Sequence, residues 1–63
     1  MKNIELKELR DKTGLTQSKF AAFYEIPLRT YEDWETGRRQ IAAYLFKLLK
    51  RAVDEDFKNE IKT

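Results

Sequence analysis

The arginines are the side chains of this sequence with the clearest binding chemistry. The chain contains no cysteine and no histidine, which excludes disulfides, thiolate or imidazole metal sites, and catalysis by either side chain. A guanidinium can donate two parallel hydrogen bonds to a carboxylate, a phosphate or a base edge. Arg29 stands alone, whereas Arg38 and Arg39 are adjacent and follow Gly37. The three consecutive acids at 54–56 are interpreted as solvated charge, so no catalytic residue, metal or cofactor is expected.

The stretch from residue 14 to residue 39 predicts two short helices joined by a sharp turn. Phe20 and Tyr24 are four residues apart, as on one face of a helix. Thr16 is a good N-cap, because its hydroxyl can accept a hydrogen bond from a free backbone N–H. The first of the two helices is therefore expected to begin near Gln17.

The second helix of this stretch is expected to open at Pro27 or Leu28 and to end at Gly37. Proline lacks an N–H and is tolerated at a first helical position, and glycine readily adopts the left-handed conformation that ends a helix. Glu25 and Ile26 remain for the turn. The result is a helix-turn-helix, a motif that places the start of its second helix in the DNA major groove.

Spacing within the second helix separates an inward face from an outward face. Tyr31 and Trp34 are three residues apart and are expected to face the core together with Ile26. The residues left to face outward are Leu28, Arg29, Glu32, Asp33 and Thr36.

The stretch resembles the DNA-binding domain of phage repressor and Cro proteins, the Xre-like class. That class shows a Gln that opens a helix, a small residue four positions later, and a recognition helix that ends in Glu-x-Gly and basic residues. Here these are Gln17, Ala21 and residues 35–39, Glu-Thr-Gly-Arg-Arg. The resemblance covers residues 4–53 and implies a compact, all-α, lambda-repressor-like domain of four to five helices. The class commonly has Gly where this chain has Glu25, so we expect a turn strained by about 1 kcal/mol.

Two further helices and a tail complete the expected fold. A first helix is expected over residues 3–13, with Asn3 as its N-cap, and a fourth over about residues 42–53. We divide the chain into a helix-turn-helix domain at 1–53 and an acidic helical tail at 54–63. The apolar residues expected to pack from these two helices are Ile4, Leu6, Leu9, Leu45, Leu48, Leu49 and Ala52.

Length and composition restrict the chain to one small domain. It has 63 residues, 41% of them hydrophobic and 38% charged, which suits a helical domain held by packing alone. No apolar run approaches the roughly 18 residues of a membrane span, and no cationic start followed by an apolar core indicates a signal peptide. We therefore expect a cytoplasmic protein with no membrane partner and no enzymatic activity.

The residues that would enter the major groove lie at the start of the second helix of the motif. Arg29 is expected to donate two hydrogen bonds to guanine O6 and N7, and Pro27 and Leu28 can contact a thymine methyl. Asp33 could accept from a cytosine amino group or could orient Arg29 from one turn away, and we favour the second role. The expected base-contacting residues are Pro27, Leu28, Arg29, Glu32 and Asp33.

Phosphate contacts are expected on both sides of that helix. Gln17 opens a helix, so its amide and the free N–H groups beside it form a candidate phosphate site. Such contacts position a protein on DNA without reading its sequence. The expected phosphate-contacting residues are Gln17, Lys19, Gly37, Arg38, Arg39 and Tyr44.

The resemblance also implies a structural ion pair. In the phage repressors, the arginine that matches Arg10 pairs with the glutamate of Glu-x-Gly, here Glu35. The pair would join the first helix to the end of the recognition helix, although a buried pair can cost more in desolvation than it returns.

Apolar residues in the tail predict a contact between two copies. Phe23, on the outer side of its helix, is either extra core or a protein contact surface. Residues four apart in the tail form a stripe that either pairs two chains or folds back over its own domain. The possible dimer contact consists of Val53, Phe57 and Ile61, to which Ile41 and Phe46 could add.

The sequence therefore predicts sequence-specific binding of double-stranded DNA. We expect a prokaryotic or phage transcriptional repressor that occupies an operator as a homodimer on two half-sites. The alternative is a protein-interaction module, an antitoxin or adaptor that binds a toxin or other protein partner. The net charge of only +2 and the acidic residues of the recognition helix keep that alternative open.

Overall fold

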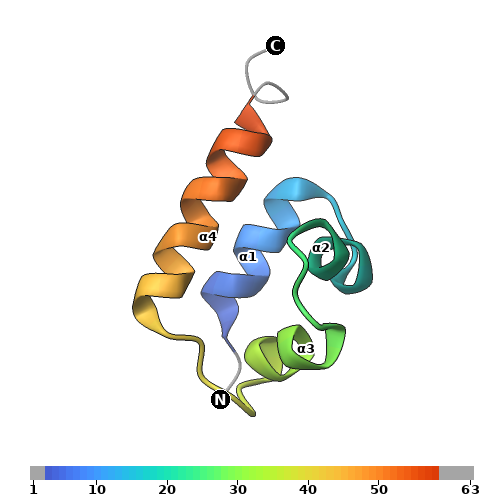
Figure 1. Cartoon of the computed structure of the whole chain (residues 1–63), viewed down its shortest axis with the longest axis vertical. Coiled ribbons are helices and arrows are strands. Elements are labelled where there is room, and N and C mark those ends of the chain that lie inside the picture. The colour runs from blue at the N-terminus through green and yellow to red at the C-terminus, as the bar shows by residue number, and fades with distance from the viewer. Residues whose placement is uncertain (1–2, 59–63) are drawn as a thin grey trace.

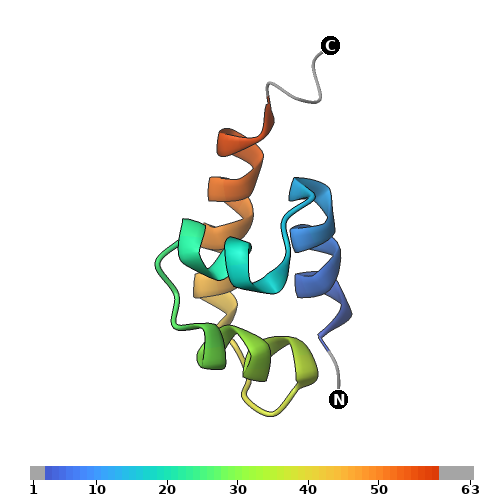
Figure 2. The same ribbon diagram turned by 90° about the vertical axis from the view of Figure 1, so that its right-hand side faces the viewer.

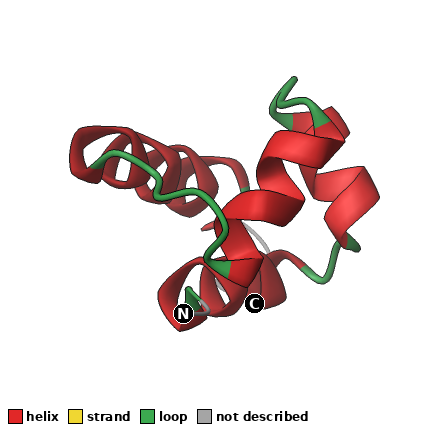
Figure 3. Cartoon of the chain, turned by 90° about the horizontal axis from the view of Figure 1, so that it is seen from below, coloured by secondary structure: helices red, strands yellow, loops and turns green. Residues whose placement is uncertain are grey.

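The computed structural model describes residues 3–58, which form four helices and, within that range, no strand (Figures 1 and 3). The helices are α1 (Ile4–Thr13), α2 (Gln17–Phe23), α3 (Leu28–Thr36) and α4 (Ala43–Asp56). Figure 2 shows α1 and α4 side by side, with α2 crossing them and α3 lying across their lower end. The all-α fold expected from the sequence is confirmed.

Side-chain caps begin the first two helices where the sequence predicted. The Asn3 side-chain oxygen accepts a hydrogen bond from the Leu6 N–H at 3.0 Å. The Thr16 hydroxyl accepts one from the Lys19 N–H at 3.2 Å. Each contact satisfies one of the backbone donors that a helix leaves free in its first turn.

The joint between α2 and α3 is a tight turn with one strained residue. Glu25 has φ of 57°, a left-handed conformation that disfavours side chains with a Cβ. The backbone N–H groups of Glu25 and Ile26 donate to the carbonyls of Ala22 and Ala21 at 3.1 and 2.8 Å. The turn is therefore closed by backbone hydrogen bonds, with Glu25 where the resemblance leads one to expect glycine.

The core lies where the four helices converge. Phe20 and Tyr31 are fully buried, and their ring centroids are 5.2 Å apart. Trp34 and Ile26 pack against this core, as the spacing of α3 predicted. The buried cluster consists of Leu6, Leu9, Phe20, Ala21, Tyr31, Leu49 and Val53.

The sequence misjudged which side chains of α4 and α1 face the core. The fourth helix continues past Val53 to Asp56. Leu48, expected to pack inside, is 55% exposed, while its neighbour Leu49 is buried. Ile4 is also exposed rather than packed.

The tail residues predicted to pair two chains mostly pack on their own domain. Val53 is buried in the core, as is Ile41, so neither offers a contact surface. Phe57 packs against the core with its ring centroid 5.5 Å from that of Phe23. Ile61 lies outside the described residues. The predicted dimer contact is therefore wrong for Val53. The structure favours the alternative in which the start of the tail packs on its own domain.

The aromatic residues at the far end of α2 join it to the end of α4. The Phe23 ring is 53% exposed and meets the Tyr24 ring edge-on at 4.8 Å. The Tyr24 hydroxyl donates to the Asp56 carboxylate at 3.0 Å. Phe46 also packs against the core rather than lying free.

No helix within residues 3–58 is long and apolar enough to cross a membrane.

Candidate nucleic-acid interface

An open hollow of about 690 Å³ lies along the outer face of α3. It brings together residues from the start of α2, the whole length of α3 and the turn that follows. Its walls include members of both the base-contacting and the phosphate-contacting sets that the sequence predicted. The lining residues are Gln17, Arg29, Glu32, Asp33, Thr36, Gly37 and Arg38.

The start of α3 is free to meet a partner. Pro27 occupies the N-cap position with φ of −56°, and no side chain caps this helix end. The free N–H groups and the positive end of the helix dipole therefore attract a negatively charged or hydrogen-bond-accepting group. Leu28 is 40% exposed and Arg29 is exposed beside it. Glu32, one turn further on, is half-buried.

Asp33 does not hold Arg29, which corrects the role favoured from the sequence. Its side chain is only 13% exposed and faces the turn after α3, where Arg39 Nε lies 3.6 Å and Arg38 Nε 4.0 Å from its carboxylate oxygens. No ion pair joins Asp33 to Arg29 in the part of the chain that the structure describes. The physical reason is the path of the backbone, because the Arg39 N–H donates to the Asp33 carbonyl at 3.1 Å and brings both arginines back over α3.

The remaining phosphate candidates lie on the surface around α3. The side chains of Arg38 and Arg39 are 71% and 67% exposed. Tyr44 is exposed at the start of α4, and Lys19 is exposed in the first turn of α2. Gly37 takes a left-handed conformation with φ of 87°, which turns the chain from α3 into the loop seen in front of the helices in Figure 3.

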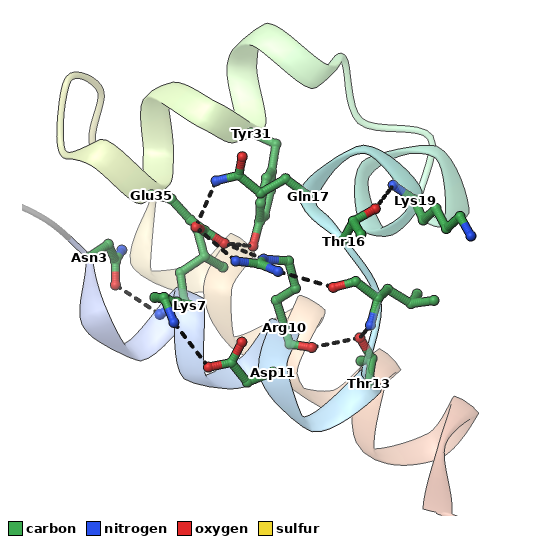
Figure 4. A network of polar contacts seen from close by, with 12 residues as sticks. Asn3, Lys7, Arg10, Asp11, Thr13, Thr16, Gln17, Lys19, Tyr31 and Glu35 are labelled. Atoms are coloured by element: carbon green, nitrogen blue, oxygen red, sulfur yellow. Dashed lines mark hydrogen bonds and ion pairs between the residues drawn. The ribbon is translucent and has the colours of Figure 1, made fainter.

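Gln17 makes an internal contact that the sequence did not predict. Its side-chain amide donates to Glu35 Oε1 at 2.9 Å, as Figure 4 shows. One amide N–H is thereby used inside the protein rather than left for a phosphate. The contact fixes the orientation of the Gln17 side chain at the edge of the hollow.

The predicted pair of Arg10 and Glu35 is present and is the centre of a larger network (Figure 4). Arg10 Nε donates to Glu35 Oε2 at 2.7 Å, and a terminal nitrogen of Arg10 donates to the Leu15 carbonyl at 3.0 Å. The buried Tyr31 hydroxyl donates to the same Glu35 oxygen. The spacing of Tyr31 and Glu35, four residues apart on one helix, is the sequence signal that could have revealed this contact.

Electrostatics in this network favour the charged form of Glu35. Burial alone would raise its pKa, but hydrogen bonds from Arg10, Tyr31 and Gln17 together outweigh burial and lower the pKa of this carboxyl below its ordinary value. The hydrogen bond to Glu35 raises the pKa of Arg10, and burial raises that of Tyr31. No buried side-chain nitrogen or oxygen within residues 3–58 lacks a partner. The network therefore joins α1, α2 and α3 behind the hollow.

Comparison with known protein families identifies the family of this chain. A family model described as helix-turn-helix matches residues 6–56, which is more than half of the chain and includes α2, α3 and α4 complete. No curated protein and no solved structure matched the sequence.

Proposed function

The chain belongs to the Xre-like, lambda-repressor-like helix-turn-helix family of DNA-binding regulators, and from this premise we propose that it is a prokaryotic or phage transcriptional repressor. It binds double-stranded DNA sequence-specifically and acts by occupying an operator in the cytoplasm. The observation that carries the proposal is the hollow along α3, which is lined by Arg29 near the uncapped start of the helix and by Arg38 after its end, with Arg39 beside it.

The start of α3 is the part proposed to read bases. Arg29 is exposed there and has no ion-pair partner within residues 3–58, so its guanidinium is available to guanine O6 and N7. Pro27 and Leu28 offer apolar contact to a thymine methyl, and Glu32 can accept from a cytosine amino group. A good bidentate pair, such as that of Arg29 with guanine, discriminates against a wrong base by about 1–3 kcal/mol.

Phosphate contacts are proposed to supply most of the affinity. Lys19 lies in the first turn of α2, Arg38 and Arg39 follow α3, and Tyr44 lies in the first turn of α4, all of them exposed. Gln17 would contact a phosphate through its second amide N–H, because Glu35 accepts the first. Phosphate contacts release counterions, so binding through them weakens steeply as salt rises.

We still propose that two copies bind two half-sites, but through the outer face of α4 rather than through the stripe of Val53, Phe57 and Ile61. One recognition helix reads one half-site, and half-sites lie about 34 Å apart. Tyr44 and Leu48 are 70% and 55% exposed on the outer face of α4, whose first turn lies at the same end as α3 (Figure 1). Lys47 and Arg51 flank them, so pairing in the absence of DNA is expected to be weak.

The test is binding to random duplexes across a salt series, followed by selection of bound sequences. Arg29→Ala should lose about 1–3 kcal/mol on the selected site and flatten preference at one position, whereas Arg39→Ala should weaken all duplexes alike and lower the salt slope. Lys12→Ala is the matched control, because Lys12 is exposed near the end of α1 away from α3. Wild-type protein that bound no duplex in a salt-dependent way would contradict the proposal and favour the antitoxin or adaptor alternative.

A further inference from the structure

Asp33 lines the hollow along α3, and its carboxylate faces the two arginines of the turn that follows the helix. Its side chain is 13% exposed, whereas the two arginines over it are 71% and 67% exposed. The two guanidinium groups are therefore more accessible to a partner than the carboxylate with which they pair. The Thr36 hydroxyl and the Arg39 N–H both donate to the Asp33 carbonyl, at 3.3 and 3.1 Å, and hold the turn in that position.

The Asp33 carboxylate lies within ion-pair distance of both arginines, at 3.6 and 4.0 Å, without a hydrogen bond to either. Turning toward a base edge would move it away from both guanidinium groups, so the pairing disfavours contact with cytosine. The phosphates of a bound duplex would instead approach the outer sides of Arg38 and Arg39, since nucleic-acid phosphates are bound through such exposed cations. Asp33 and a phosphate then compete for the same two guanidinium groups.

We propose that Asp33 is a positioning residue that competes with DNA phosphates for Arg38 and Arg39, and so sets the level of affinity without reading a base. The inference rests on the proposed function and deepens it. In the free protein the carboxylate holds the two arginines beside the end of α3. On DNA, phosphate oxygens take over part of this pairing, so every duplex binds less tightly than two unpaired arginines would allow.

The experiment compares wild type with Asp33→Asn in duplex binding, salt dependence and motif selection. Exposed pairs of this length are individually weak, so the variant should bind all duplexes about 3- to 10-fold more tightly at low salt. The magnitude of the slope of log K against log salt should rise by up to about 0.9, the increment for one further neutralised phosphate. The selected motif should stay unchanged, and Asp33→Glu should restore part of the wild-type behaviour.

The control repeats Asp33→Asn in a chain that also carries Arg38→Ala and Arg39→Ala. The gain in affinity should disappear there, because Asp33 acts through these two arginines. A gain that persists would mean direct repulsion of phosphate, and loss of preference at one base pair would mean that Asp33 reads a base. Either result, or unchanged affinity and slope, would overturn the proposal.

A measurement without DNA separates this inference from the proposed function. In the free protein at low ionic strength, Asp33→Asn should shift the ¹⁵N–¹H resonances of the Arg38 and Arg39 Nε–H groups and speed their exchange with water. Unchanged resonances would overturn the pairing even if the wild type binds DNA. If the resonances shift but the wild type binds no DNA, the proposed function is rejected, and with it the competition between Asp33 and DNA phosphates. The pairing of Asp33 with Arg38 and Arg39 in the free protein would still stand.

Discussion

Removing the charge of Glu35 should destabilise this domain more than removing the whole ion pair. The Glu35 side chain is 7% exposed and that of Arg10 15% exposed, so the pair is shielded from solvent on both sides. Glu35→Gln keeps the size of the side chain but only one of its two acceptor oxygens, of which Oε2 binds Arg10 and Tyr31 and Oε1 binds Gln17. It also leaves the Arg10 guanidinium without its counter-charge. The guanidinium keeps its hydrogen bond to the Leu15 carbonyl at 3.0 Å.

The expected magnitude follows from the burial of the pair. Breaking a buried pair by removing one partner costs about 3–5 kcal/mol, and a carboxamide that keeps some hydrogen bonds should cost about 3 kcal/mol. A chain of 63 residues has a free energy of unfolding of roughly 3–9 kcal/mol. The single substitution should therefore remove a large part of the stability.

The assay is a double-mutant cycle followed by urea unfolding and far-UV circular dichroism. Arg10→Met combined with Glu35→Gln removes both charges and keeps the apolar stem, so it should lose less than Glu35→Gln alone. The control cycle uses Lys7→Met and Asp11→Asn, an exposed pair at 3.2 Å that should contribute no more than about 0.5 kcal/mol. Additive losses in the Arg10 and Glu35 cycle would refute the reasoning.

Three further predictions follow from the same structure. Glu25→Gly should stabilise the domain by about 0.5–1 kcal/mol, because glycine adopts the positive φ of 57° at this position without strain. Gly14→Ala should destabilise the domain, because Gly14 has φ of 74°; a Cβ there would meet no other atom within 4 Å, so the loss would come from backbone strain alone. Melting temperatures that change in the opposite directions would contradict this. Folding lowers the pKa of Glu35, so the unfolded state takes up a proton on this carboxyl at a higher pH than the folded state does. The stability that ionised Glu35 contributes is therefore present above the ordinary carboxyl pKa and is lost as pH falls through the pKa of the folded state. In Glu35→Gln, the urea midpoint should fall less steeply with decreasing pH than in the wild type. Leu48→Glu should weaken pairing on a two-half-site duplex and leave binding to a single half-site nearly unchanged, and sedimentation that shows equal pairing by both proteins would exclude α4 as the contact.

The ends of the first three helices could be predicted from the sequence because their signals are local. Asn3 and Thr16 cap the backbone three residues ahead of them, and Pro27 admits a helix only on its C-terminal side. The strain at Glu25 was also predictable, because the turn requires a left-handed residue whatever side chain stands there. Each of these depends on neighbours within a few residues and not on how the helices pack.

The faces of α4 could not be predicted in the same way. Its apolar residues form two overlapping stripes, and adjacent residues on a helix point about 100° apart. Leu49 and Val53 fall on the stripe that meets α1 and are buried, while Leu48 falls on the other and is exposed. Which stripe meets the body depends on the angle at which α4 crosses α1, and that angle arises only from packing the whole domain.

The acids of α3 show why residue counts understate the DNA-binding character of this surface. The helix contains Glu32, Asp33 and Glu35, which in the sequence keep a protein partner open as an alternative to DNA. In the structure Glu35 turns inward to Arg10, and Asp33 turns to Arg38 and Arg39. Residues two apart on a helix do not share a face, so the two carboxylates are neutralised by different partners on different sides. Of these three acids, only Glu32 lacks an ion pair within residues 3–58. Arg29 and Arg38 line the hollow together with Glu32 and Asp33, and Arg39 lies beside it against Asp33. The arginines of this surface therefore outnumber its acids, a balance that favours an anionic partner.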